Sequence, residues 1–123
     1  MALQLIDLGS EIEYVDVRAE RVPYSFTTRL AGLTFGFTIK YNERGGFYTV
    51  DLRNNRGDVL VFGDPIRYGR ALFNSVEDER FPEPAIIPFC LTGEDIDTVT
   101  VDNFGTSVRL YLHEREVVSW LSG

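Results

Sequence analysis

Segments of alternating apolar and polar residues between positions 24 and 53 constrain the fold of this chain more than any other feature. In the segment 33–41, apolar side chains occupy every second position, with threonine, glycine and lysine between them. A period of two is typical of a β-strand with one buried face. The predicted core face of this strand comprises Leu33, Phe35, Phe37, Ile39 and Tyr41.

Two further alternating segments and one short apolar segment flank this strand and are separated by turn-forming residues. Residues 24–30 lead into Ala31-Gly32, where glycine can adopt the positive φ of a tight hairpin turn. Residues 47–53 follow a turn at 42–46, and residues 59–62 follow a turn at 54–58, in which we expect Gly57 at positive φ. The second of these strands sets Tyr48, Val50 and Leu52 opposite Thr49, Asp51 and Arg53. The pattern predicts a four-stranded antiparallel meander.

The rest of the chain favours additional strands joined by loops. Residues 14–17 are typical of a short strand, and 86–92, 96–101 and 108–112 of three later ones, with a turn at 103–105. Residues 63–69 are an edge strand or a broad connection, because a proline cannot donate to a ladder. The nearly continuous apolar run at 86–92 indicates burial on both faces or an oligomer contact. We predict an all-β domain of about eight or nine antiparallel strands, as a small β-barrel or a two-layer sandwich built on the meander.

The two ends of the chain allow several interpretations. Residues 1–13 are predicted to be an N-terminal arm, an added edge strand or a leader introduced for expression, and residues 14–123 a single β domain. Near the other end, Val117, Val118 and Leu121 recur at helical spacing beside Trp120. This pattern predicts a short C-terminal helix or an extended tail, whose apolar side chains would need to pack against something.

The charge balance argues against nucleic acid as a partner. The chain has 12 basic and 19 acidic residues and a formal net charge of −7, whereas a nucleic-acid-binding protein needs a basic face. All basic residues except Lys40 are arginine, which is enriched in protein interfaces, although codon usage in a GC-rich genome explains the bias equally well. The sequence shows no membrane-length apolar run and no signal peptide, so we expect a soluble protein made in a reducing bacterial cytoplasm.

Residues that carry enzymatic chemistry are sparse. Cys90 is the sole cysteine and lies in an apolar segment, which predicts a buried, inert thiol and excludes an intramolecular disulfide. His113 is the sole histidine and is predicted to be an exposed surface residue rather than a general base. The acidic residues 77–79 lack a calcium-loop pattern and are predicted to belong to a solvated loop, with Phe81 as its anchor. The sequence therefore predicts no catalytic, cofactor or metal site, and no enzyme.

The order of turns and strands resembles a family of small bacteriophage tail proteins. The segments that carry the likeness are Pro23-Tyr-Ser-Phe26, Leu30-Ala-Gly32, Ile39-Lys-Tyr-Asn42, Arg44-Gly-Gly-Phe-Tyr48, Val50-Asp-Leu52, Gly63-Asp-Pro-Ile66 and Tyr68-Gly-Arg-Ala-Leu-Phe73. They resemble the family of the cyanophage baseplate plug, from about residue 15 to residue 112. The resemblance implies a structural protein of the virion, in the tail baseplate of a phage or prophage. It would lie near the tail axis, pack against hub, tail-tube or other baseplate proteins, and have no active site.

Partner contacts are predicted where the chain offers strand edges or an apolar tail. Segments 15–17 and 66–68 are prone to be edges, which invite pairing with another chain. The predicted contact residues are Val15, Val17, Ile66, Tyr68, Val118, Trp120 and Leu121. We expect a closed homo-oligomer or a complex with a hub or tube protein. The alternative is a carbohydrate- or receptor-binding module of the tail tip, which would present Tyr24, Tyr68 or Trp120 on a concave face.

Overall fold

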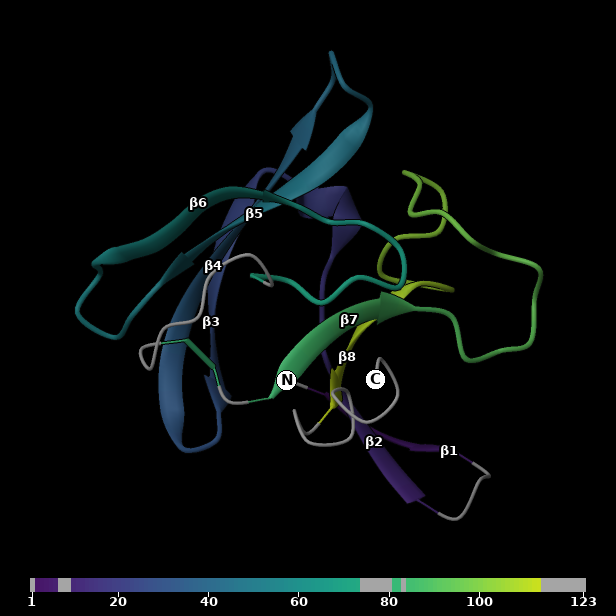
Figure 1. Cartoon of the computed structure of the whole chain (residues 1–123), viewed down its shortest axis with the longest axis horizontal. Coiled ribbons are helices and arrows are strands. Elements are labelled where there is room, and N and C mark those ends of the chain that lie inside the picture. The colour runs from purple at the N-terminus through teal and green to yellow at the C-terminus, as the bar shows by residue number, and fades with distance from the viewer. Residues whose placement is uncertain (1, 7–9, 74–80, 83, 114–123) are drawn as a thin grey trace.

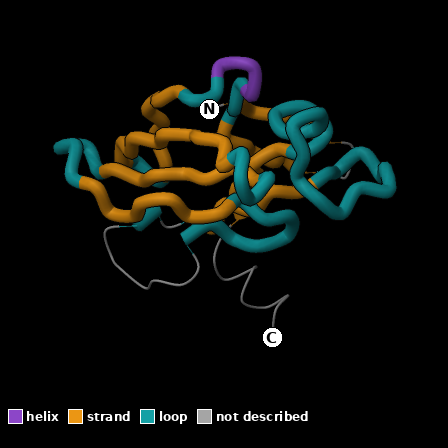
Figure 2. Tube along the Cα trace, turned by 90° about the horizontal axis from the view of Figure 1, so that it is seen from above, coloured by secondary structure: helices purple, strands orange, loops and turns teal. Residues whose placement is uncertain are grey.

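The computed structural model describes residues 2–6, 10–73, 81–82 and 84–113, which form eight β-strands and one short 3-10 helix (Figure 1). In chain order these are β1 (Ala2–Ile6), β2 (Ser10–Val15), η1 (Ala19–Arg21), β3 (Tyr24–Leu30), β4 (Leu33–Asn42), β5 (Phe47–Arg53), β6 (Val59–Pro65), β7 (Ala85–Phe89) and β8 (Arg109–His113). The 3-10 helix stands outside the layers of strands, and long loops extend beyond them (Figure 2). No helix in the described residues is long and apolar enough to cross a membrane.

The strands form two antiparallel sheets. One has the order β3-β4-β5-β6, which is the predicted meander, and the other has the order β1-β2-β8-β7 (Figure 1). No ladder joins the two sheets within the described strands, so they form separate layers rather than a closed barrel. The predicted all-β class is confirmed. β1 and the start of β2, at residues 2–6 and 10–13, pair with each other, while the interpretation of residues 1–13 as an arm or added leader stays a prediction.

Two turns set the register of the meander as the sequence predicts. Ala31 and Gly32 both have positive φ, at 51° and 82°, as a type I′ hairpin turn requires, and they pair Leu30 with Leu33. Gly57 has a φ of 88°, which confirms the prediction for that residue. Its turn is held by Asn54, whose Oδ1 accepts the backbone N–H groups of Arg56 and Asp58, both at 2.9 Å. The turns therefore fix which face of each strand points inward.

One hydrophobic core lies between the sheets. From β4, the side chains of Phe35, Phe37 and Ile39 are fully buried, and Tyr41 packs against them partly buried. They meet residues of both sheets, among them Val50 and Leu52 of β5, Val15 of β2, Ile86 of β7 and Leu110 of β8. The predicted core face of β4 is confirmed except at Leu33, which is 56% exposed because it closes the hairpin at the end of the sheet.

The strand predicted at 96–101 is wrong. Residues 90–103 form an irregular loop because the side chain of Asn103 satisfies backbone groups that a ladder would otherwise pair. Its Oδ1 accepts the N–H of Thr100 at 2.8 Å, and its Nδ2 donates to the carbonyl of Thr98 at 3.0 Å. The predicted turn at 103–105 is present, and it leads into β8. A segment with strand-like alternation thus forms a loop whose backbone is hydrogen-bonded by its own Asn103 side chain.

Other differences from the sequence prediction are smaller. β6 extends to Pro65 at the edge of its sheet, which confirms the edge-strand alternative for residues 63–65. β7 ends at Phe89, and the loop 69–72 covers its outer edge, where Gly69 and Leu72 donate to the carbonyls of Pro88 and Ile86, both at 2.8 Å. The predicted C-terminal helix or tail at 114–121 and most of the acidic loop at 74–83 lie outside the described residues, although the predicted anchor Phe81 is buried.

Candidate partner-binding groove

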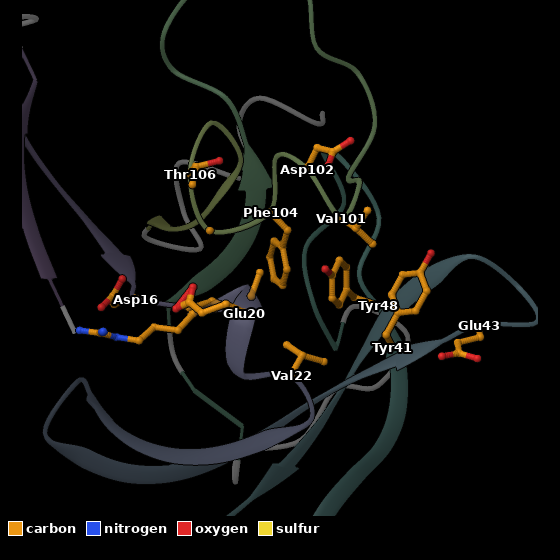
Figure 3. Close-up of a pocket in the computed structure, with 14 residues that line it drawn as sticks. Asp16, Glu20, Val22, Tyr41, Glu43, Tyr48, Val101, Asp102, Phe104 and Thr106 are labelled. Atoms are coloured by element: carbon orange, nitrogen blue, oxygen red, sulfur yellow. The ribbon is translucent and has the colours of Figure 1, made fainter.

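A groove of about 730 Å³ opens where three segments that are distant in the sequence meet (Figure 3). They are the link 16–22 between β2 and β3, the hairpin end of β4 and β5, and the loop 101–106 before β8. We call this site the acidic groove. Its apolar floor is formed by Val22, Tyr41, Tyr48 and Phe104, and its rim carries the carboxylates of Asp16, Glu20, Glu43 and Asp102.

The floor of the acidic groove is a row of packed aromatic rings. Tyr41 and Tyr48 are direct partners in the β4–β5 ladder, and their ring centroids lie 4.9 Å apart in an edge-on arrangement. The Phe104 ring lies 4.6 Å from that of Tyr48 and reaches it from the loop before β8 (Figure 3). Tyr48 and Phe104 are buried in the core cluster, so the floor is anchored to both sheets.

Glycine brings two walls of the groove into contact. Gly105 has a φ of 87°, and a Cβ atom at this position would lie 2.6 Å from the carbonyl oxygen of Val17. A side chain would therefore push the loop 101–106 away from the link that carries Asp16 and Glu20. The link itself is fixed by the 3-10 turn and by the backbone N–H of Arg18, which donates to the Tyr24 hydroxyl at 2.8 Å.

The electrostatic field in the acidic groove is negative. Four carboxylates line it with a single guanidinium, that of Arg18, and none of the four acids forms an ion pair with another described residue. Burial and the acids raise the pKa of two tyrosines, Tyr48 in the groove and Tyr24 next to the link. Burial raises the pKa of Tyr48, and the neighbouring Tyr41 and Asp102 raise it further. Burial likewise raises the pKa of Tyr24, to which Asp16 and Glu20 add, against the hydrogen bond from Arg18. The groove thus favours a cationic occupant.

The described part of the chain contains no group of three or more histidine, cysteine, aspartate or glutamate side chains placed to hold a metal ion. The rim acids are instead spread along the groove, with Asp16 and Glu20 toward one end and Glu43 at the other (Figure 3). Such spacing suits several separate cationic groups of a polypeptide better than one ion.

The comparison with known families places this fold among phage proteins. The family model described as cyanophage baseplate Pam3 plug gp18 matches residues 12–115. The chain belongs to this baseplate plug family. The match spans every segment that forms the acidic groove and all strands from β3 to β8. A search of curated proteins gives no match.

Membership in the plug family implies a structural role. It also implies a place in the virion, in the tail baseplate, and association with other phage tail proteins. The resemblance inferred from the order of turns and strands is confirmed, and its extent agrees with the match to within a few residues.

Three of the predicted contact residues of this plug protein have buried side chains. Val15, Val17 and Ile66 belong to the hydrophobic core, so their side chains face inward. Val15 of β2 pairs with Leu110 of β8, and β2 lies between β1 and β8, so it is not an edge strand. The N–H of Ile66 donates to the Tyr48 carbonyl at 2.9 Å, which continues the pairing of the edge strand β6 with β5. Of these three, Val17 lines the acidic groove.

The other four predicted contact residues are Tyr68 and three residues near the C-terminal end. Tyr68 is half-buried, stacks on Phe89 at 5.3 Å and accepts the N–H of Cys90 at 3.1 Å, so its hydroxyl is engaged within the chain. Val118, Trp120 and Leu121 lie outside the described residues. A contact role for all seven residues stays a prediction.

The structure also shows the positions of the sole cysteine, Cys90, and the sole histidine, His113. Cys90 is buried, as predicted, with its Sγ 3.0 Å from the Thr92 hydroxyl. His113, predicted to be exposed, is half-buried at the end of β8, where it pairs with Ala85 of β7, and this burial lowers its pKa. The structure thus corrects the position of His113, which lies in a sheet rather than on an open surface.

The acidic groove itself escaped the sequence analysis. Its acids come from three separate parts of the chain: Asp16 and Glu20 from the link between β2 and β3, Glu43 from the β4–β5 turn, and Asp102 from the loop before β8. The available signal was that each acid lies close to a predicted strand end rather than in a run of charge. Nothing in the sequence indicates that these strand ends meet.

Proposed function

We propose that this plug-family protein is a structural subunit of a phage or prophage tail baseplate that packs near the tail axis against hub or tail-tube proteins. The match to the baseplate plug family over residues 12–115 carries the proposal, because it covers nearly the whole described fold. The architecture supports it, since one core joins two sheets into a rigid body suited to repeated contacts in an assembly.

The surface of the protein also supports a role in binding other proteins. The acidic groove offers aromatic side chains next to unpaired carboxylates, and aromatic residues are enriched at the centres of protein interfaces. Its charge disfavours binding to nucleic acid. Of the aromatic residues considered for carbohydrate recognition, Tyr24 and Tyr68 have hydroxyls that accept hydrogen bonds from the backbone of the chain itself, and Trp120 lies outside the described residues.

Co-expression with the hub and tail-tube proteins of the same phage tests the proposal. The complex should elute together in size-exclusion chromatography, with a mass from light scattering that exceeds that of the free chain. A chain that stays monomeric at all concentrations, binds neither protein and instead binds cell-wall glycan would refute the proposal and favour a receptor-binding module.

A further inference from the structure

We infer that the acidic groove receives a short, extended segment of a neighbouring tail protein that carries arginine or lysine side chains around an apolar residue. This inference rests on the proposed function and adds the chemistry of the partner. The apolar residue would lie against the exposed surface of Val22, Tyr41 and Val101, and the cationic side chains would reach the carboxylates of the rim (Figure 3).

Val101 gives the acidic groove an exposed apolar surface. This side chain is 56% exposed although it lines the groove directly beside the aromatic floor. Tyr41 and Val22, which are only partly buried, continue the same surface. Apolar groups exposed in a concave site lose contact with water when a partner side chain covers them, so they are typical of binding sites.

The carboxylates of the rim are distributed along the acidic groove. Glu43 extends the aromatic row at one end, Asp16 and Glu20 lie toward the other, and Asp102 is on the loop above (Figure 3). All four are exposed, and none is paired within the described residues. Opposite charges on a partner would steer its approach and fix its register along the groove. A peptide with cations on both sides of one apolar residue matches this arrangement.

The size of the groove limits the occupant to a short segment. A volume of about 730 Å³ falls within the range of roughly 300–1,000 Å³ that is usual for pockets enclosing small ligands. A folded domain would contact only the rim and leave the floor uncovered. An extended segment places its side chains on the floor and the rim together, as in other sites that recognise peptides by pockets for alternate side chains.

The test measures binding of the hub and tail-tube proteins of the same phage to variants of the groove. The double variant Glu43→Lys, Asp102→Lys reverses two rim charges. The matched control is Glu94→Lys, Asp95→Lys, which makes the same change in net charge at exposed residues that do not line the groove. Val101→Ser removes exposed apolar surface without changing charge. Circular dichroism and thermal melting establish that each variant is folded.

For the tail protein that binds the wild type, the groove variant should lower affinity at least tenfold and weaken its dependence on salt. The control variant should stay within about twofold of the wild type, and Val101→Ser should lower affinity several-fold at unchanged salt dependence.

A carbodiimide, which joins carboxylates to amines without a spacer, should link Glu43 or Asp102 to a lysine of the partner where the segment contains one. Equal affinities of the wild type and the groove variant overturn the inference and leave the proposed function intact. An equal loss in the control variant also overturns it. If the wild type binds neither tail protein, the proposed function fails as well.

Discussion

Lys40→Met tests whether the outer face of the meander depends on one buried charge. Asp51 is only 2% exposed, although it lies on the face of β5 opposite the core residues Val50 and Leu52. Its Oδ1 accepts the N–H of Gly63 at 2.8 Å, and its Oδ2 lies 3.0 Å from Nζ of Lys40. The same ammonium group lies 4.0 Å from the centre of the Phe62 ring. Replacement by methionine keeps most of the apolar side chain and removes the cation.

The expected cost follows from the burial of the two partners. Removing one member of a buried ion pair costs about 3–5 kcal/mol, because the other charge stays buried without compensation. Lys40 is 37% exposed, so water weakens the pair, and we expect about 2–3 kcal/mol. Asp51→Asn should cost less, about 1–2 kcal/mol, because the amide oxygen still accepts the N–H of Gly63 and the freed ammonium group can rehydrate.

Urea denaturation of the wild type, both single variants and the double variant closes a thermodynamic cycle. The coupling energy should be about 1–2 kcal/mol, and Lys40→Arg, which retains the positive charge, serves as the matched control. The reasoning is refuted if Lys40→Met destabilises no more than Asp51→Asn. It is also refuted if the coupling falls below about 0.5 kcal/mol, the level expected of independent sites.

Three further outcomes are expected from the structure. Phe37→Ala should destabilise the fold by about 3–5 kcal/mol in urea denaturation, because the ring is fully buried, whereas Leu33→Ala at the exposed hairpin end should cost less than about 1 kcal/mol. Gly57→Val should lower the melting temperature well beyond Gly57→Asn, since a β-branched residue fits a φ of 88° poorly and asparagine tolerates it; equal melting temperatures would contradict this. Burial raises the pKa of Asp64 despite the N–H of Phe73 and the charge of Arg70, so the folded protein binds this proton more tightly than the unfolded chain does. Stability should then fall as the pH rises from about 4 through the folded pKa, and Asp64→Asn, which retains an acceptor for Phe73, should abolish that fall in urea titrations between pH 4 and 7.

The sequence predicted β3, β4 and β5 of the meander well because their apolar and polar residues alternate. Phe37 and Ile39 alternate with Thr38 and Lys40, and glycines mark turns that need positive φ, so local pattern and tertiary burial agree. The alternation did not indicate that Asp51, on the polar face of β5, is buried. The Lys40 ammonium group of β4 and the N–H of Gly63 in β6 are its partners, and no local pattern encodes partners from neighbouring strands.

Residues 96–101 show a second limit of local patterns. Their alternation satisfies the rule for a strand, yet Asn103 offers the backbone side-chain partners within a few residues, and a loop results. This failure bears on the candidate site, because the loop carries Val101 and Asp102 into the groove. A strand at 96–101 would have placed Val101 in a ladder instead.

The binding surface that we infer therefore depends on contacts that form only when both sheets have packed. Phe104 reaches Tyr48 across the core, and Gly105 allows the loop to lie against the backbone of Val17. These two contacts hold the loop that carries Asp102 against the link that carries Asp16 and Glu20. Glu43 approaches the other end of the same groove from the β4–β5 turn. Carboxylates at separate points of one groove would attract the cationic groups of a partner segment and set its register in the assembled baseplate.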